Sequence, residues 1–374
     1  MTVENALNAY IDLNVLLIAV TAIWMVLQWT LARTSLRAAY LTQLRLLYGL
    51  IAMVLLSPLI VFCIETCQRW GLVSVRGGFS LSDFAVAQYL HGNIALSPTK
   101  FESLLMLRSE WTHGIASFNT WMGFAVFGLL LSGFGVMVIR NAKNSWRLIR
   151  LIGRAYPLRS IGKVDIRVSH ETRVPFSTRG LWRYHVVLPT GLLAHSNDAR
   201  IAVAHEIQHI RQGDLAWEIA LELMRPFFFW NPAFARCKRD VERLRELACD
   251  QQVLGRKTHA TRAYCECLLR ACQNSLNTGP ATQIMTPSVP FVQLDLRKRA
   301  NHSEGFLKQR IISMIEQGQS SGSHRLGPVL LMSLLATVTC ITLAIRPVES
   351  WSHDRLMLST IVNLERLNNR TVSQ

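Results

Sequence analysis

Two histidines and a glutamate in the segment 205–209, which reads His-Glu-Ile-Gln-His, are the residues best suited to chemistry in this sequence. The surrounding residues favour a helix, for which the cluster 196–198 (Ser-Asn-Asp) supplies N-caps. Residues four apart lie on the same face of an α-helix. His205 and His209 can therefore offer two imidazoles to one metal ion, and Glu206 can reach a water molecule bound to that ion. A charged helix face with two unrelated histidines is the alternative interpretation.

A third metal ligand is expected further along the chain, because hydrolytic zinc sites usually use three protein ligands and keep one position for water. Residues 240–250 are expected to form a second helix, in which Glu242, Glu246 and Asp250 recur every four residues and share one face. One carboxylate could bind the metal while the others accept hydrogen bonds from the histidines. The spacing alone does not choose between Glu242 and Glu246, and interleaved Glu and Arg would also suit a solvated helix face.

The chain is more apolar than an ordinary soluble enzyme, since 50% of its 374 residues are hydrophobic and 17% are charged. Four stretches carry no charge over nearly the length that crosses about 30 Å of hydrocarbon. Glu4 and Asp12 precede the first of them, where a cleaved signal peptide would carry basic residues. The sequence therefore predicts an integral membrane protein with four helical spans, at 13–32, 46–64, 114–139 and 326–345.

The basic residues indicate the orientation of the chain, because cytoplasmic loops of membrane proteins are enriched in Lys and Arg. Arginines without acidic residues follow the first span, and a strongly basic stretch follows the third. The segment 140–325 is therefore expected in the cytoplasm and both termini outside. Most of the net charge of +16 belongs to this segment, where it would attract anionic lipid of the inner leaflet. The basic residues form no known DNA-binding motif, so direct nucleic-acid binding is not expected.

The cytoplasmic segment is predicted to be mainly helical with a small sheet before the HExxH helix. Its alternating and β-branched stretches indicate two strands with a turn between them, and its last part indicates a mobile loop followed by an amphipathic helix. The expected elements are a helix along the membrane surface (140–156), strands (164–168 and 184–188), a turn at Pro175 and Arg179-Gly180, a helix (258–274), the loop (275–305) and the amphipathic helix (308–315).

The eight cysteines do not indicate a second metal site. Cys265, Cys267 and Cys272 are close in sequence, but no paired CxxC motif or histidine set accompanies them. In a reducing cytoplasm we expect ordinary buried thiols. Cys249, beside the predicted metal helix, is expected to be a small core residue.

Several blocks of residues, in this order and spacing, resemble the peptidase domain of the BlaR/MecR signal-transducer metallopeptidases. They are the HExxH segment with Asp214 five residues beyond it, Trp230-Asn231-Pro232, and Glu246-Leu247-Ala248-Cys249-Asp250 followed by Val253-Leu254. A weaker match, Leu307-Lys308-Gln309-Arg310-Ile311, precedes the last span, and the resemblance extends over residues 1–345. It is far more specific than HExxH alone.

The resemblance implies a complete zinc centre with one Zn2+ per chain. Glu246 would be the third ligand beside His205 and His209, and Glu206 would be the catalytic base. Asp250 would orient a ligand imidazole, as in the ExxxD arrangement of the CAAX-type and HtpX-type membrane proteases. Asp214 would do the same. The implied fold is an α-helical integral membrane protein with four spans and a mainly α (α+β) cytoplasmic metalloprotease domain of the zincin-like (gluzincin) class. In such proteases a sheet edge typically holds the substrate by strand addition.

The implied function is that of a signalling endopeptidase in a bacterial-type inner membrane. Its substrate would be a cytoplasmic regulatory protein, such as a transcriptional repressor, and self-cleavage would be compatible with the resemblance. The BlaR/MecR receptors carry a penicillin-binding sensor domain after the final span, whereas residues 346–374 are too few to bury a domain-sized core. Beta-lactam sensing is therefore not expected. A housekeeping membrane protease of the CAAX/HtpX-like type and a non-catalytic receptor that keeps the fold are the alternatives.

These predictions together divide the chain into six parts. They are an N-terminal transmembrane hairpin (1–65), an extracytoplasmic loop (66–113), a third transmembrane helix (114–139), the zinc metallopeptidase domain (140–325), a fourth transmembrane helix (326–345) and a short extracytoplasmic tail (346–374).

Overall fold

The fold is taken from a computed structural model, which describes most of the chain. The described residues are 3–70, 86, 88–91, 96–104, 121–180, 182–256, 260–276, 289–290, 300–316, 332–334, 336–341 and 358–364. The chain divides into two compact units. One comprises residues 1–23, 49–131 and 328–374, and the other comprises residues 24–48 and 132–327, which include the HExxH segment.

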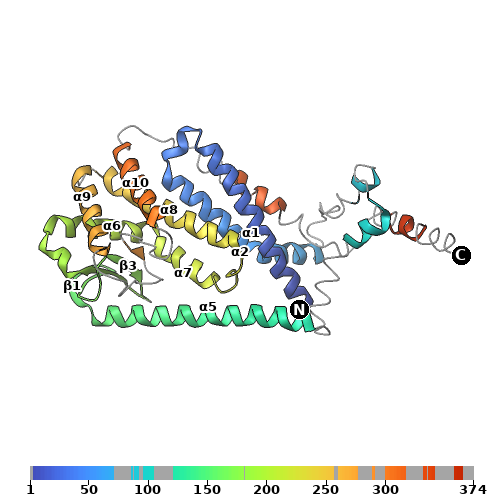
Figure 1. The fold of residues 1–374 in the computed structure, drawn as a ribbon, viewed down its shortest axis with the longest axis horizontal. Helices are drawn as coiled ribbons and strands as arrows, with labels where there is room; N and C mark the ends of the chain where they lie inside the picture. Colours follow the sequence, from blue (N-terminus) through green and yellow to red (C-terminus); the bar gives the residue numbers. More distant parts are fainter. Residues whose placement is uncertain are drawn as a thin grey trace. The chain divides into compact units, whose positions relative to one another are not determined.

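Three described helices are long and apolar enough to cross a membrane, namely α1 (Val3–Leu31), α2 (Tyr40–Arg69) and α5 (Trp121–Arg154) (Figure 1). They coincide with the first two predicted spans and with residues 121–139 of the third, whose first residues, 114–120, lie outside the described residues. A short 3-10 helix (Ser35–Ala38) connects the first two. Of the predicted fourth span, residues 332–334 and 336–341 are helical, and the rest lies outside the described residues.

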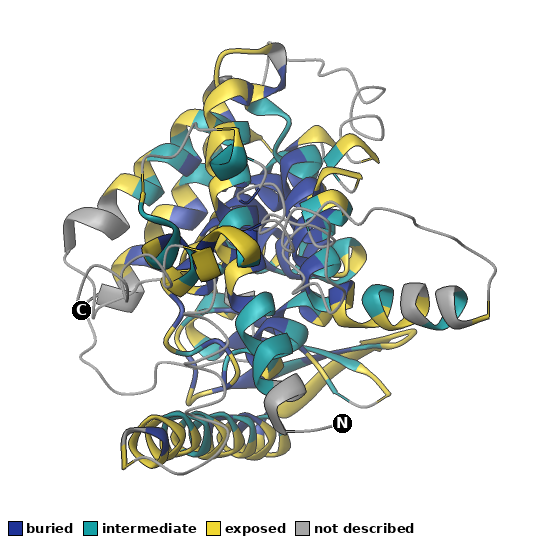
Figure 2. Ribbon diagram, turned by 90° about the vertical axis from the view of Figure 1, so that its right-hand side faces the viewer, coloured by how far each residue is buried: buried dark blue, intermediate teal, exposed yellow. Residues whose placement is uncertain are grey.

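Helix α5 joins two elements that the sequence predicts separately. The third span and the expected surface helix form one continuous helix of 34 residues. At 1.5 Å per residue it is about 50 Å long, more than the hydrocarbon core requires. In its apolar stretch only 6% of the residues are buried, and Figure 2 shows the helix mostly in the colours of exposed and intermediate residues. The predicted helix end at 156 is wrong by two residues, because the helix stops at Arg154 and a strand starts at Tyr156.

A five-stranded mixed sheet follows α5, with the order β1-β2-β4-β3-β5. The two predicted strands are confirmed as β2 (Val164–Ser169) and β4 (Tyr184–Pro189), which pair in parallel. The sequence does not predict β1 (Tyr156–Ile161), whose residues are all exposed and show no alternation, or β3 (Phe176–Arg179), which is only four residues long. The turn expected around Pro175 and Arg179-Gly180 therefore contains a strand.

The short strand β5 (Val289–Pro290) lies within the segment 275–305, for which the sequence predicts a mobile loop. It pairs antiparallel with β3, Ser177 opposite Val289 and Phe176 opposite Pro290. Helix α10 (Ala300–Glu316) also begins inside that segment, eight residues before the predicted start at 308. Residues 277–288 and 291–299 lie outside the described residues. The expected loop is thus interrupted by a strand and shortened by a helix.

Each face of the sheet packs against a different helix (Figure 1). On one face, Ile166, Val186 and Leu188 pack with Ala202 of α6 (Ser196–Gln212). On the opposite face, Phe176 and Val187 of the sheet pack with apolar residues near the end of α5, namely Leu148, Leu151 and Ala155. Because strand residues alternate between faces, Ser177 lies on the α6 face, beside the helix with the HExxH segment.

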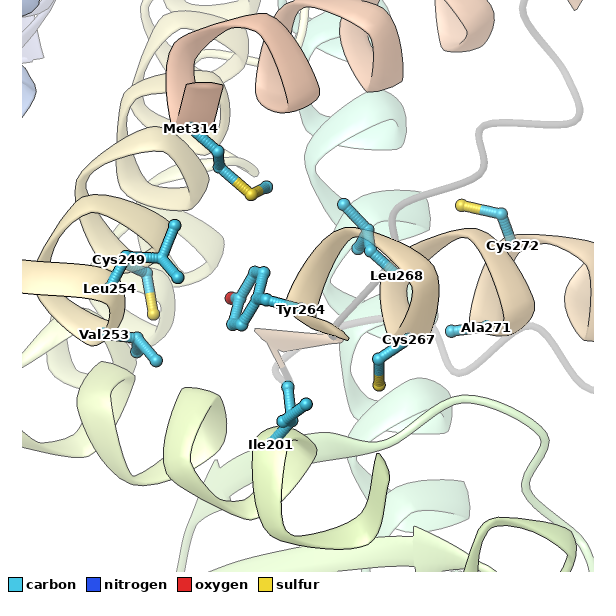
Figure 3. Close-up of a cluster of buried hydrophobic side chains, with 10 residues drawn as sticks. All are labelled: Ile201, Cys249, Val253, Leu254, Tyr264, Cys267, Leu268, Ala271, Cys272 and Met314. Atoms are coloured by element: carbon cyan, nitrogen blue, oxygen red, sulfur yellow. The ribbon is translucent and has the colours of Figure 1, made fainter. Parts of the chain in front are cut away.

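The remaining helices form a second layer of the same unit. They are α7 (Asp214–Met224), α8 (Pro232–Gly255), α9 (Thr261–Leu276) and α10. Pro232 lies in the first turn of α8, as predicted, and the Asn231 side chain caps that helix by accepting from the Ala233 N–H at 2.9 Å. A buried cluster joins α6, α8, α9 and α10, with Tyr264 at its centre (Figure 3).

In the other unit, described pieces of the predicted extracytoplasmic loop and tail pack together. Val86 and Phe101 from the loop form a buried cluster with Leu358 and Val362 from the tail. The tail therefore contributes to a small apolar cluster, although most of both segments lies outside the described residues.

Candidate metal centre

Helix α6 brings the two predicted histidine ligands together as the spacing requires. The Nε2 atoms of His205 and His209 lie 3.0 Å apart, and both side chains are fully buried. The predicted N-caps of this helix are wrong. His195 occupies the N-cap position without a side-chain cap bond, and Asp198 instead accepts two hydrogen bonds from Arg270 of α9 at 2.7 and 2.8 Å. Asp198 thus ties α6 to α9.

Gly213 ends α6 in a conformation that positions the next residue of the site. Its φ of +78° lies in the left-handed region, which favours glycine, and its N–H bonds back to the carbonyl groups of His209 and Ile210. The chain therefore turns directly into α7, whose first residue is Asp214. This tight turn lets Asp214 reach His209 from five residues away.

Helix α8 supplies a carboxylate that faces both histidines. Glu246 Oε2 lies 3.6 Å from His205 Nε2, and Glu246 Oε1 lies 3.7 Å from His209 Nε2. Zinc with ligands at about 2.0–2.1 Å in a tetrahedron places its donor atoms about 3.3 Å apart. The three observed separations of 3.0, 3.6 and 3.7 Å bracket that value. The other sequence candidate, Glu242, is partly exposed and pairs with Lys238 at 3.8 Å.

Cys249 also lies close to the histidines, which the sequence does not predict. Donor atoms of His205, His209 and Cys249 lie within 4.8 Å of one another. The Cys249 Sγ, however, is 3.4 Å from His205 Nδ1, the ring nitrogen opposite the one that faces Glu246. Burial raises the pKa of this thiol, and only the thiolate is a good metal ligand. The Nε2 atoms with Glu246 therefore fit one zinc ion better than a set that includes Cys249.

The outer ring nitrogens of the two histidines have different partners. His209 Nδ1 lies 2.8 Å from Asp214 Oδ2, while the Tyr48 hydroxyl donates to the other Asp214 oxygen at 3.4 Å. His205 Nδ1 lies 2.7 Å from the Tyr264 hydroxyl, and Asp250 Oδ1 is further away, at 3.5 Å. Both predicted acidic partners are therefore close, but the Tyr264 hydroxyl lies nearer to His205 Nδ1 than Asp250 does.

Glu206, the second residue of the HExxH segment, lies beside these residues. It is fully buried, and neither of its oxygens has a hydrogen-bond partner among the described residues. Burial raises the pKa of Glu206 to about 7, against the opposing effects of His209 and of the Ser177 hydroxyl from β3. Burying a carboxylate without a partner is costly. Such a group is therefore well suited to a site that holds a cation and a water molecule.

The environment of Glu246 keeps that group ionised. Burial by itself would raise its pKa, but His205, Arg310 and His209 lower it to about 2. Arg310 of α10 lies 3.3 Å from Glu246 and also donates two hydrogen bonds of 2.7 Å to Asp250. The Glu246 oxygens have no hydrogen-bond partner among the described residues. Two imidazoles and one ionised carboxylate are a donor set that fits zinc.

The comparison with protein families agrees with this geometry. The model of the family described as BlaR1 peptidase M56 matches residues 11–297, which include most of α1 and all of α2, the HExxH helix and α8. A search of curated proteins found no match. With three helices fit to cross a membrane, the chain is a multi-pass membrane protein. It belongs to the M56 family of BlaR1-type membrane metallopeptidases.

Proposed function

We propose that this chain is a zinc-dependent endopeptidase whose single zinc ion is held by His205, His209 and Glu246. The observation that carries the proposal is the convergence of two buried imidazoles and a buried carboxylate. The two Nε2 atoms lie 3.0 Å apart, and each of them lies 3.6–3.7 Å from a different oxygen of Glu246. Two imidazoles and a carboxylate leave the fourth position of a tetrahedral ion for water. That water would lie next to Glu206, the one buried carboxylate of the HExxH segment.

Bound zinc would polarise the scissile carbonyl and acidify its water. Glu206 would accept the proton of that water at a carboxylate oxygen and deliver it to the leaving amine. A carboxylate with a raised pKa is a stronger base than an exposed one, and burial raises the pKa of Glu206 in the metal-free protein. Asp214, by accepting the Nδ1 proton of His209, would keep Nε2 of that ring unprotonated and directed to the ion.

Strand β3 is the strand best placed to hold an extended substrate, in the position that the short strand β5 takes in the sheet. Ser177 of this strand lies on the sheet face that packs against α6, where its hydroxyl lowers the pKa of Glu206. Val289 and Pro290 of the same chain already pair antiparallel with this strand. Strand addition of this kind is how extended peptides bind to exposed sheet edges. The pairing supports self-cleavage in the segment around 289–290, with external substrates taking the same position.

A closed site favours a signalling protease over a housekeeping one. His205, Glu206, His209 and Glu246 are all fully buried. A substrate would reach them only after the covering elements have moved apart, and a protease that awaits a signal needs such a resting state. We therefore propose a cytoplasmic regulator of repressor type as the substrate. In the proposed topology four spans place residues 140–325 in the cytoplasm, both termini lie outside, and basic side chains contact anionic inner-leaflet lipid.

The test is a comparison of protein fragments in cells that express the wild type, Glu206→Gln or Glu242→Gln. We expect new N-termini of a cytoplasmic regulator in cells with the wild type and with Glu242→Gln, because Glu242 is partly exposed and pairs with Lys238. Cells with Glu206→Gln should lack those fragments although that variant still binds zinc. Identical fragments and phenotype in all three strains would show that proteolysis is not the function.

A further inference from the structure

The two histidines of the proposed zinc centre are held by chemically different partners. His209 Nδ1 faces a carboxylate oxygen of Asp214 directly, at 2.8 Å. His205 Nδ1 faces the hydroxyl of Tyr264 at 2.7 Å. The carboxylate expected to hold His205, that of Asp250, is 3.5 Å from the same nitrogen but only 2.7 Å from the tyrosine hydroxyl.

The direction of the hydrogen bonds follows from the partners of Asp250. Arg310 donates to both Asp250 oxygens at 2.7 Å, an arrangement typical of an ionised carboxylate. An ionised carboxylate can only accept, so the Tyr264 hydroxyl donates its single proton to Asp250. Its oxygen is then left to accept the Nδ1–H of His205. This fixes the tautomer of His205 that has a free lone pair on Nε2, the nitrogen that faces Glu246 and His209.

Tyr264 is held rigidly enough for this task. Its ring is fully buried between Ile201 of α6, Cys249 of α8 and Leu268 of α9, and its hydroxyl points to the helix that carries Cys249 (Figure 3). The ring therefore cannot leave without disturbing the core. The hydroxyl adds two short hydrogen bonds that a phenylalanine of the same shape would lack.

We propose that Tyr264 is a positioning residue of the zinc centre, which links His205 to the Asp250–Arg310 pair and so sets the orientation and tautomer of that imidazole. The proposal rests on the zinc centre described under Proposed function. It assigns a role to a residue of α9 that lies outside the HExxH and ExxxD segments. It also makes α10, through Arg310, part of the support of the metal site.

The test measures zinc affinity of the full-length protein in detergent by competition with a chromophoric chelator. Loss of a hydrogen bond behind a metal ligand typically weakens binding 10–100-fold, so we expect Tyr264→Phe to bind zinc about 10–100-fold more weakly than the wild type. The visible spectrum of the Co2+-substituted protein should also change, because the His205 ring is no longer fixed. Asp250→Ala combined with Tyr264→Phe should lose less than the sum of the two single losses, since both act on the same nitrogen.

Two control variants separate positioning from packing. Leu268→Ala disturbs the same core on the same helix and should lower the unfolding temperature of the metal-free protein without changing zinc affinity. Tyr156→Phe removes an exposed hydroxyl and should change neither quantity. Equal zinc affinity of Tyr264→Phe and the wild type would overturn the proposal, and so would an equally large loss in Leu268→Ala. A wild type that binds no zinc would instead overturn the proposed centre itself.

Discussion

Replacement of Glu206 by glutamine should stabilise the metal-free protein by an amount that grows as the pH rises from about 4.5 to about 7. Burial raises the pKa of Glu206 from an ordinary 4.5 to about 7. The folded protein therefore holds this proton more tightly than the unfolded chain does. The fold is not penalised below the unfolded pKa, near pH 4.5, and loses stability as the pH rises towards 7. Glutamine keeps the shape of the protonated acid and has no such loss.

The size of the effect follows from the two pKa values. The difference between 4.5 and about 7 corresponds to about 3 kcal/mol in the free energy of unfolding. We expect Glu206→Gln to match the wild type near pH 4 and to exceed its stability by about 3 kcal/mol at pH 8. Zinc should reduce this gap, because a cation beside the carboxylate offsets the cost of ionisation.

The assay is denaturant-induced unfolding of the full-length protein in detergent with a metal chelator, at a series of pH values. Glu266→Gln serves as the matched control, because Glu266 lies on the surface of α9 and pairs with Arg262 at 2.9 Å. Its stability relative to the wild type should not follow the same pH dependence. A constant difference between Glu206→Gln and the wild type from pH 4 to pH 8 would refute the reasoning, as would a wild type that is the more stable protein at pH 8.

Three further predictions test the surroundings of the centre. Asp214→Asn should weaken zinc binding about 10–100-fold in chelator competition. The control is Asp240→Asn, because Asp240 is a buried carboxylate that binds Trp24 and Arg236 instead; this variant should lower stability and leave zinc affinity unchanged. Arg310→Met should lower the free energy of unfolding by about 3–5 kcal/mol, because it leaves two buried carboxylates without their cation; an unchanged denaturation midpoint would contradict this. Burial raises the pKa of Cys267 to about 12, so iodoacetamide at pH 8 should modify this thiol only after denaturation. Mass spectrometry measures the modification, and rapid labelling of the folded protein would contradict the packing of α9.

The parts of the site that repeat at helical spacing could be predicted from the sequence. His205 and His209 share a face because they are four residues apart, and Glu246 and Asp250 do so for the same reason. Spacing left Glu242 as an equal candidate. The choice depends on how α8 is rotated against α6, and the structure turns Glu246 to the histidines and Glu242 to Lys238.

Tyr264 and Arg310 could not be found in this way. Each is a single residue on its own helix, and each reaches the site only because α9 and α10 pack on α8. Arg310 does fall in the weaker family-like segment 307–311, which was the only signal available. Such contacts between distant helices leave no periodic pattern in a single sequence.

The sheet shows the same limit. Strands β2 and β4 have buried faces and an apolar pattern, and the sequence predicts both. Strand β1 has all six residues exposed, and β3 and β5 are too short for a pattern to emerge. These strands exist because a neighbouring strand supplies their backbone hydrogen bonds. Strand pairing of this kind is a property of the fold and not of local sequence.

The most direct test of the central claim is X-ray absorption spectroscopy at the zinc edge of the purified protein, with the zinc content measured alongside. The claim requires one zinc per chain with nitrogen and oxygen ligands at about 2.0–2.1 Å, from His205, His209, Glu246 and water, and no sulfur. A zinc–sulfur distance of about 2.3 Å would assign Cys249 as a ligand and contradict the claim, and so would an unchanged spectrum and zinc content in Glu246→Ala.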